Sequence, residues 1–414
     1  MRSSRVLLTG LMAALLGSCG GGGGGGSGGG PPIGGGSGFT PGVFAAATSF
    51  EARCSAPRSG SDPQGRPWPD RLGTALDEKN WLRSWTHELY LWYREVADRD
   101  PAAFSVLDYF DLLKTPQSTA SGQPKDRFHF AIPTNAWLQQ SQLGSSAGYG
   151  LQWAILADTP PRELRVAYIE PGATSPAAAV GLARGARVLA IDGIDLVNST
   201  AGADIDRLND ALFPSGTGQS HSFTVQDIGG GPQRSVSMTS ANVTATPVQN
   251  TRSIATASGP VGYLLFNDHI ATSEAGLVQA ITTLRNAGAV DLVLDLRYNG
   301  GGFLDIASEL AYMVAGNART SGRTFELLQF NDQHPTRDPV TGELLAPLPF
   351  HSTAEGFSVA QGTALPTLNL GRVYVLTGGA TCSASESIIN SLRGVDVEVI
   401  QVGSTTCGKP YGFY

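Results

Sequence analysis

The sequence predicts a protein of mixed α+β and α/β fold with several domains, and three patterns support this prediction. Residues 74–145 carry apolar side chains at helical spacing, residues 146–246 contain short strands with two short helices, and residues 247–414 alternate strands with helices. Strands that alternate with helices are typical of a largely parallel sheet. At 414 residues the chain is long enough for two or three domains, each with its own hydrophobic core.

Charge and composition exclude some classes of function. The chain has 28 Lys and Arg against 35 Asp and Glu, a net charge of −7 and no basic block, so a nucleic-acid partner is not expected. No apolar run reaches the roughly 18 residues that a membrane-spanning helix needs. No cluster of side chains has the spacing of metal ligands, so neither a metal nor a cofactor is expected.

The first 19 residues have the composition of an export signal. Arg2 and Arg5 give a charged start, residues 6–16 are mostly apolar, and small residues precede Cys19. This ending resembles the signal of a bacterial lipoprotein, in which the cysteine is lipidated and becomes the mature N-terminus. Because the next residue is not an aspartate, the resemblance implies an anchor in the outer membrane that faces the periplasm. An ordinary signal peptide with an incidental cysteine is the alternative.

Residues 20–73 are expected to form a tether and a loosely ordered lead-in. Residues 20–38 are nearly all glycine with a few Ser and Pro, and such a segment behaves as a flexible coil with a span of about 25 Å. A lipid anchor with this tether would hold a folded body near a membrane without fixing its orientation.

Two patterns predict the helical segment at 74–145. One helical face is expected through Leu82, Trp85, Leu89, Trp92 and Val96. Asp100-Pro101 predicts the start of a second helix, with aspartate as the N-cap and proline in the first turn. The apolar face of this second helix is expected to consist of Val106, Leu107, Phe110 and Leu113.

Residues 146–246 have the pattern of a small β domain. A glycine-bounded turn at 148–151 leads into the first strand. Further strands are expected at 164–169, 187–191 and 222–225. Two short helices are expected, one beginning at Ser175-Pro176 and one around residues 208–213.

This set of elements resembles a PDZ domain, a small β-barrel with two helices. The resemblance rests on the glycine loop at 148–151, on Glu-Pro-Gly-Ala-Thr-Ser-Pro-Ala-Ala at 170–178 and on Gly-Ala-Arg-Val-Leu-Ala-Ile-Asp-Gly at 185–193. A glycine loop exposes N–H groups that can hold the carboxylate of a peptide, and the strand after it can add the peptide as a further strand. The expected peptide-binding residues are Gly148, Tyr149, Gly150 and Leu151. A β-turn without a ligand is the alternative.

Three glycine-rich loops follow strands in residues 247–414. The strands are expected at 261–266, 290–296, 373–376 and 397–402, with helices at 275–287, at 304–313 and after residue 383. Ligands of such sheets bind at the carboxyl ends of the strands, so these loops are where a site is expected. The first loop ends in Gly300-Gly-Gly302, whose bare amides could bind an anion or a developing oxyanion.

Ser383 has two competing interpretations. Ser383-Ala-Ser-Glu386 matches a capping box, in which the serine caps a helix and the glutamate reaches back. Alternatively, Ser383 is a nucleophile at a helix N-terminus, and the amides of the first turn and of the loop at 300–302 hold the oxyanion. The two interpretations compete for one hydroxyl.

A nucleophilic serine needs a base, and Lys409 is the favoured candidate. It is one of only four lysines and lies in a glycine-containing turn after an apolar run. The pKa of a lysine is about 10.4 in water, and burial can lower it by about 3 to 5 units. None of the six histidines falls in a glycine turn at a strand end, but His269 follows a strand and stays as the alternative base of a hydrolase acting on small esters.

Together these motifs resemble the C-terminal processing (tail-specific) serine peptidases over about residues 75–414. In that family the first serine of Ser-Ala-Ser-Glu is the nucleophile, and the lysine of a Gly-Lys turn about 25 residues later is its general base. These roles fall on Ser383 and Lys409. The family's oxyanion amides would be those of Ala384 and Gly301, with Gly302 as the neighbouring choice.

The resemblance also implies fold and function. The last segment is expected to form a ClpP/crotonase-like α/β catalytic domain. The expected activity is that of a serine endopeptidase that cleaves periplasmic or envelope proteins and recognises substrate C-termini through the PDZ domain. A PDZ-bearing binding lipoprotein with a degenerate peptidase domain is the alternative.

The sequence departs from the family in several places. Phe413 stands where the family commonly has a glutamine that orients the lysine, and Gly300 replaces a proline. The strands and helix expected after Lys409 are absent, which predicts a fragment of a longer reading frame. Cys382 and Cys407 flank the two proposed catalytic residues, and a disulfide between them is possible in an oxidising compartment.

Overall fold

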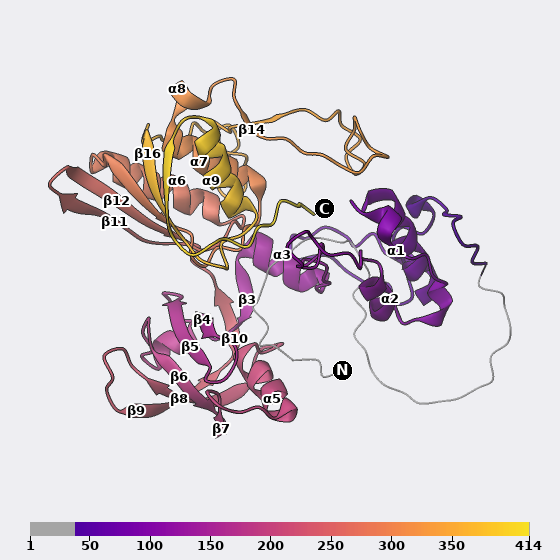
Figure 1. Cartoon of the computed structure of the whole chain (residues 1–414), viewed down its shortest axis with the longest axis horizontal. Helices are drawn as coiled ribbons and strands as arrows, with labels where there is room; N and C mark the ends of the chain where they lie inside the picture. The colour runs from indigo at the N-terminus through magenta and orange to yellow at the C-terminus, as the bar shows by residue number, and fades with distance from the viewer. Residues whose placement is uncertain (1–37, 414) are drawn as a thin grey trace. The chain divides into compact units, whose positions relative to one another are not determined.

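The computed structural model describes residues 38–413, whose helices and strands are shown in Figure 1. Internal contacts divide the chain into two compact units. One comprises Gln139–Phe325 and Pro349–Tyr411, and the other comprises the described residues up to Leu138 together with Glu326–Leu348, Gly412 and Phe413. The predicted signal peptide with Cys19, and nearly all of the glycine-rich tether, lie outside the described residues. Within the described part, no helix combines the length and the hydropathy needed to cross a bilayer.

The N-terminal unit is built around α1 (Ala75–Leu89). Thr74 caps this helix, because the Asp77 N–H donates to Thr74 Oγ1 (3.1 Å) and the Thr74 N–H donates to the Asp77 carboxylate (2.8 Å). The helix ends where Tyr90 takes an extended backbone (φ −62°, ψ 131°). Other short elements before residue 144 include η1 (Ala47–Ser49), β1 (Arg53–Cys54), β2 (Arg71–Leu72) and α3 (Thr134–Leu143).

Two predicted helix boundaries are wrong. The first helix does not continue to Val96, since Tyr93–Glu95 is a separate 3-10 turn (η2). Asp100 does cap a helical turn, but only the 3-10 turn Pro101–Ala103 (η3), and α2 (Val106–Leu112) begins separately. The spacing of apolar residues therefore predicted which side chains are buried, but it did not predict where the helices begin and end. Buried residues of this core include Trp81, Leu82, Tyr109, Phe110 and Leu113, whereas Leu107 is 66% exposed.

The segment from 145 to 244 forms a mostly antiparallel sheet with its own core. The strand order is β4 (Leu151–Ala157), β5 (Glu163–Ile169), β6 (Arg187–Ile191), β8 (Ser220–Gln226) and β9 (Gln233–Thr239), with β7 (Ile194–Asp195) paired to β6. A separate pair joins β3 (Ser145–Gly148) to β10 (Ala241–Thr244), and the helices are α4 (Pro176–Ala179) and α5 (Gly202–Leu212). Val188, Leu208 and Phe223 are buried in this core. In this order β4 is an edge strand.

The segment from 248 onward forms the sheet that carries the candidate site. Its strand order is β11 (Val248–Thr256), β12 (Gly259–Phe266), β13 (Asp291–Asp295), β16 (Arg372–Thr377) and β17 (Glu398–Gly403). The last four strands are parallel, as the sequence predicts, and the antiparallel β11 was not foreseen. The helices are α6 (Ser273–Asn286), α7 (Leu304–Ala315), α8 (Asn317–Thr320) and α9 (Ala384–Gly394), and two short strands are β14 (Thr324–Glu326) and β15 (Leu348–Pro349).

Burial explains why these strands and helices form here. Leu292 and Leu294 of β13 and Val373 and Val375 of β16 are fully buried, as expected for central strands of a parallel sheet. The helix α7 is buried along most of its length and packs in the same core. Because β13, β16 and β17 are adjacent and parallel, their carboxyl ends bring the three glycine-rich loops to one edge of the sheet.

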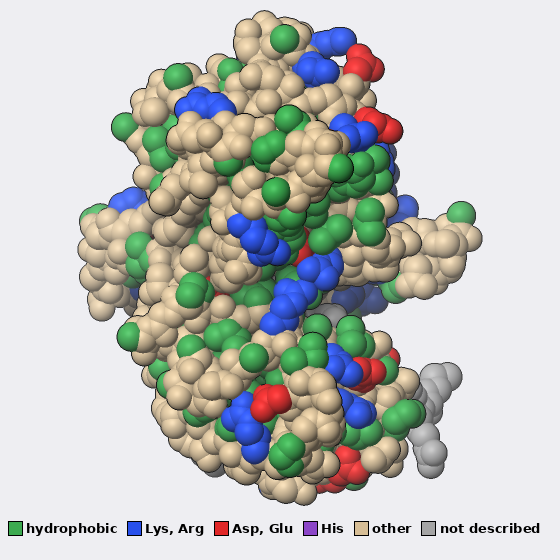
Figure 2. Space-filling model, turned by 90° about the vertical axis from the view of Figure 1, so that its left-hand side faces the viewer, with side chains coloured by type: hydrophobic (Ala, Val, Ile, Leu, Met, Phe, Trp, Pro, Cys, Tyr) green, Lys and Arg blue, Asp and Glu red, His purple; other side chains and the backbone are tan. Residues whose placement is uncertain are grey.

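One face of the molecule carries a group of basic side chains. Figure 2 shows lysine and arginine side chains gathered near the middle of that face, although the whole chain carries a net charge of −7. Such a local excess of positive charge favours the approach of anionic groups.

Candidate active site

Ser383 occupies a strained position directly before α9. Its backbone has φ 56° and ψ −120°, a region that residues with a side chain rarely adopt. Such strain persists only when the surrounding structure enforces it, and it is frequent at active sites. The first amides of a helix have no partner within the helix, and among the described residues the Ala384 N–H has no hydrogen-bond acceptor. The turn therefore presents Ser383 next to an unused N–H group.

Gly301 brings the first glycine loop into direct contact with this turn. A Cβ atom at this position would lie 2.7 Å from the Cβ of Ser383 and 2.9 Å from the amide nitrogen of Ala384. The backbone of Gly301 also has a positive φ of 99°. Only glycine fits here without displacing the serine, so tertiary contact explains the glycine.

The amide of Gly301 is already in use. Its N–H donates to Asn299 Oδ1 at 2.9 Å, so in this conformation it is not free to bind an oxyanion. The neighbouring Gly302 lies against the backbone of His269, where a Cβ atom would overlap the carbonyl oxygen. The assignment of the second oxyanion amide to Gly301 or Gly302 stays a prediction.

Glu386 connects the serine turn to the lysine loop. One carboxylate oxygen accepts the N–H groups of Ser383 and Lys409, each at 2.9 Å. The other accepts the N–H of Gly408 at 2.8 Å and the hydroxyl of Thr406 at 2.6 Å. The local capping role expected for Glu386 is therefore only part of its function, because the same carboxylate holds a loop more than 20 residues away.

Lys409 is buried, with only 7% of its surface exposed. Burial lowers the pKa of its ammonium group to about 8, and the negative charge of Glu386 opposes this fall. A lysine with this pKa is neutral in an appreciable fraction of molecules near neutral pH, which a general base requires.

A disulfide joins Cys382 to Cys407, whose Cα atoms are 5.1 Å apart. It links the residue before Ser383 to the loop that carries Lys409. Cys382, Glu386 and Cys407 also form the one group of three potential metal ligands found among residues 38–413. While the disulfide is intact these sulfur atoms are not thiolates, and thiolates are the form in which cysteine binds metals.

His269, the alternative base, is fully buried at the end of β12. Its Nδ1 lies 2.9 Å from Asn299 Oδ1, but its Nε2 makes no hydrogen bond to any described residue, Ser383 included. Burial lowers its pKa to about 4, against the opposing effect of the Asn299 hydrogen bond. The histidine is therefore neutral near pH 7 but not engaged with the serine.

The four predicted peptide-binding residues lie where β3 ends and β4 begins. Gly148 pairs with Ala241, and Leu151 pairs with Ile169. The side chain of Tyr149 is buried, and its hydroxyl donates to the Ala211 carbonyl at 2.9 Å. Only the main chain of Tyr149 and Gly150 is therefore a candidate for peptide contact, together with the open edge of β4.

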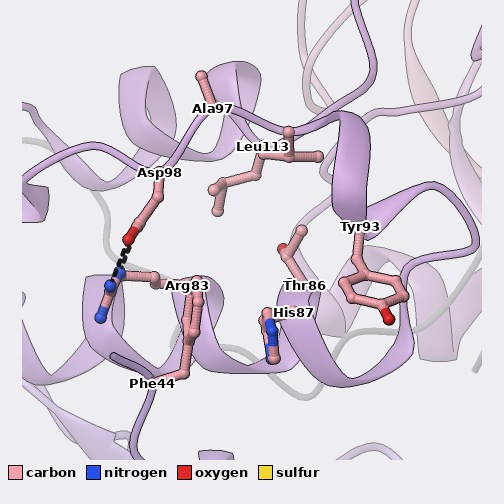
Figure 3. Close-up of a pocket in the computed structure, with 9 residues that line it drawn as sticks. Phe44, Arg83, Thr86, His87, Tyr93, Ala97, Asp98 and Leu113 are labelled. Carbon is pink, nitrogen blue, oxygen red and sulfur yellow. Dashed lines mark hydrogen bonds and ion pairs between the residues drawn. The ribbon is translucent and has the colours of Figure 1, made fainter. Parts of the chain in front are cut away.

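A small pocket in the N-terminal unit contains none of the predicted site residues. Figure 3 shows that Arg83 and Asp98 point toward one another at one side of it, and they form an ion pair of 2.6 Å. His87 stacks on Phe44 with ring centroids 3.8 Å apart. These contacts satisfy the polar groups of the pocket within the unit itself, and we assign it to packing.

Two residues at the site were not predicted from the sequence as long-range contacts, Asn299 and Glu386. Each lies inside a motif that was recognised, but its partners are distant in sequence. The glutamate at the third helical position was a visible signal, whereas nothing local distinguishes Asn299 from an ordinary loop asparagine.

Comparison with known proteins agrees with this geometry. Residues 260–412 match the model of peptidase family S41. The chain is 27% identical over 237 residues to a carboxyl-terminal-processing protease of Picosynechococcus sp., covering 57% of this chain and 52% of the relative. It is 27% identical over 285 residues to a chloroplastic C-terminal processing peptidase of Tetradesmus obliquus, covering 66% and 53%. The chain thus spans about half the length of the curated relatives that it matches.

A solved structure from Bacteroides fragilis, described as an S41 protease, has the same fold. The two structures superpose with a TM-score of 0.51 at 24% identity, covering 80% of this chain and 79% of the other. The chain therefore has a mixed α/β fold similar to that of this solved structure.

The match of residues 260–412 to peptidase family S41 agrees with the family predicted from the sequence. The curated relatives are carboxyl-terminal-processing peptidases, which agrees with the resemblance noted in the sequence.

Proposed function

We propose that the chain is an endopeptidase that uses a dyad of Ser383 and Lys409. Ser383 attacks the scissile carbonyl of the substrate, and the neutral amine of Lys409 accepts the hydroxyl proton. The resulting ammonium then donates this proton to the leaving amine. The N–H of Ala384 and one amide of the loop at 300–302 stabilise the oxyanion.

The observation that carries this proposal is the Glu386 carboxylate shared by the two catalytic segments. It accepts the N–H groups of Ser383 and Lys409 at equal distances of 2.9 Å, and the adjacent disulfide holds the same two segments together. Such a double link is not needed to cap one helix. It is what a site needs if the serine and a loop 26 residues later are to act on one proton.

We also propose that residues 146–246 form a PDZ domain beside a ClpP/crotonase-like domain at 247–414. Support comes from the glycine at 150, whose φ is 71°, and from the edge strand β4 that follows it. A substrate C-terminus would pair with this strand. Lipidation of Cys19 would place the enzyme in the cell envelope, facing periplasmic substrates.

Cleavage of an unfolded protein by purified enzyme tests the dyad. Wild type is expected to cleave, while Ser383→Ala and Lys409→Arg are expected to lose at least about 1,000-fold in kcat/KM, because neither can complete the proton transfer. Full activity of Lys409→Arg would contradict the dyad even in an active peptidase. Binding of peptides without cleavage by the wild type would support the alternative, a binding protein with a degenerate peptidase domain.

A further inference from the structure

His269 is a buried polar residue, and only one of its two ring nitrogens has a hydrogen-bond partner among the described residues. None of its surface is exposed, Nδ1 is bonded to Asn299, and Nε2 has no partner among the described residues. Buried polar groups are usually hydrogen-bonded, so a histidine in this position needs an explanation. An apolar side chain would fill the same space without leaving a nitrogen unpaired.

The hydrogen bonds around Asn299 fix the tautomer of His269. Asn299 Nδ2 donates to the Phe266 carbonyl at 3.1 Å, so Oδ1 is the acceptor atom on the other side of the amide. The Gly301 N–H donates to this oxygen at 2.9 Å, and Nδ1 of His269 lies 2.9 Å from it as well. Nδ1 must therefore carry the proton, and the unpaired Nε2 is the atom with the lone pair.

Asn299 is the point at which three segments meet. Its side chain binds the end of β12 through Phe266 and His269. Its carbonyl accepts the Cys382 N–H and the Ser385 hydroxyl, both at 3.1 Å, and these residues flank the serine turn. A displacement of Asn299 would therefore move the glycine loop and the start of α9 together.

The main chain of His269 holds the same loop. Its N–H donates to the Gly301 carbonyl at 3.2 Å, and its carbonyl accepts the Phe303 N–H at 2.9 Å. The glycine loop is thus bonded to His269 on both sides of Gly302.

We propose that His269 and Asn299 are positioning residues of the peptidase centre, and this inference rests on the function proposed above. When the oxyanion forms, the Gly301 N–H leaves Asn299 Oδ1 and donates to the oxyanion. His269 Nδ1–H stays on Asn299 Oδ1, so no buried acceptor is left without a donor. Neither residue touches the reacting atoms, and no bond in either is made or broken apart from the hydrogen bond of Gly301.

Steady-state kinetics on His269 variants tests this role. His269→Phe removes the donor and is expected to lower kcat by about 10- to 100-fold while KM changes by less than about threefold, because the bond is exchanged only in the transition state. His269→Asn places an amide N–H where Nδ1 lies and is expected to recover kcat to within about fivefold of wild type. His269→Gln places its amide nearer the Nε2 position and is expected to behave like His269→Phe.

A neighbouring residue supplies the matched control. Asn267 is also buried, and its side chain has no hydrogen-bond partner in the described structure. Asn267→Leu should therefore leave kcat within about threefold of wild type. Equal losses of kcat in His269→Phe and His269→Asn would overturn the positioning role. A loss of kcat in His269→Phe as large as that in Ser383→Ala would also overturn it, because His269 would then be the base.

Nuclear magnetic resonance of histidine labelled with nitrogen-15 gives a readout independent of activity. The signal that disappears in His269→Phe is expected to show the neutral Nδ1–H tautomer from pH 6 to 9. An Nε2–H tautomer, or a titration in this range, would contradict the inference whether or not the protein cleaves anything. If the wild type shows the expected tautomer but cleaves no protein, the proposed function is refuted. The hydrogen bond of His269 would then be confirmed, but its role in catalysis would be refuted together with the proposed function.

Discussion

At the scale of single residues, the site depends on what surrounds each side chain. Lys409 is an ordinary turn lysine by local sequence, and it becomes a candidate base because it is buried and held beside Glu386. Gly301 is an ordinary loop glycine by local sequence, but in the fold its contact with Ser383 leaves no room for a Cβ atom. Each of these residues supports a specific prediction.

The pKa of Lys409 predicts the pH dependence of cleavage. Burial lowers this pKa to about 8, and the neutral amine is the active form. Below that pH the neutral fraction falls about tenfold per pH unit, so kcat/KM is expected to rise from pH 6 to about pH 8 and then level off. Rates measured from pH 6 to 10 on one unfolded substrate check this, and a plateau that begins near pH 6 would contradict Lys409 as the base.

Gly301→Ala and Gly300→Ala form a matched pair for the contact with the serine. At position 301 the new Cβ would lie 2.7 Å from the Ser383 Cβ and at a positive φ, whereas at position 300 nothing lies within 4 Å. We expect the first change to lower kcat/KM by at least about 100-fold, since a displacement of about 1 Å at a site can cost that much. The second is expected to stay within about threefold. Equal effects of the two changes would argue against close contact between loop and serine.

At the scale of elements, the disulfide connects the start of α9 to the loop after β17. It closes a segment with a sequence separation of 25 residues, and a loop of this length stabilises the folded state by about 3.5 kcal/mol in the chain-entropy model. Reduction is therefore expected to lower the urea midpoint and to lower cleavage, because it frees the lysine loop. The inactive variant Ser383→Ala is the control for stability. Reduction should lower its urea midpoint as much as that of the wild type, which shows that the loss of stability does not depend on activity. An unchanged midpoint would show that Glu386 alone holds the loop.

At the scale of the whole molecule, buried carboxyl groups make stability depend on pH. Glu309 of α7 is fully buried, and burial raises its pKa to about 8, with the Glu355 N–H opposing and the charge of Glu274 adding to the rise. Glu274 in turn accepts the N–H groups of Gly356 and Val359, so both carboxyls lie under one loop.

A raised folded-state pKa means that the folded protein binds a proton that the unfolded chain releases. The contribution of Glu309 to stability is therefore complete below its unfolded pKa of about 4.5 and is lost as pH rises toward about 8, at about 1.4 kcal/mol per pH unit. Glu309→Gln should remove this slope, so the variant should gain stability relative to wild type between pH 5 and 8. Urea midpoints across this range measure the difference, and parallel curves would show that Glu309 is not protonated in the folded state. Burial also raises the pKa of Asp268 to about 8, so Asp268 adds a similar pH dependence to both proteins. Only the difference in urea midpoint between wild type and Glu309→Gln therefore reports on Glu309.

Much of the architecture followed from the sequence because it depends on local patterns. The apolar run at β13, the turn at Asp192-Gly193 and the proline at the start of α4 are each recognisable within a few residues. The antiparallel β11 was missed because its residues are mostly exposed and show no apolar alternation. The end of α1 was misplaced because an extended residue inside a helical pattern leaves no local signal.

The sequence by itself indicated the resemblance to a peptidase family, the four parallel strands of the last segment, and the serine, lysine and glycine loops that meet at one sheet edge. Only the tertiary structure decided that Glu386 joins the serine turn to the lysine loop, that Asn299 accepts the Gly301 N–H and that Lys409 is buried. The physical reason is that hydrogen-bond partners and desolvation depend on groups far apart in the chain, and no local pattern records which of them fold together. The sequence specifies which side chains are present, whereas the fold determines their pKa values and which of their hydrogen-bond donors are unpaired.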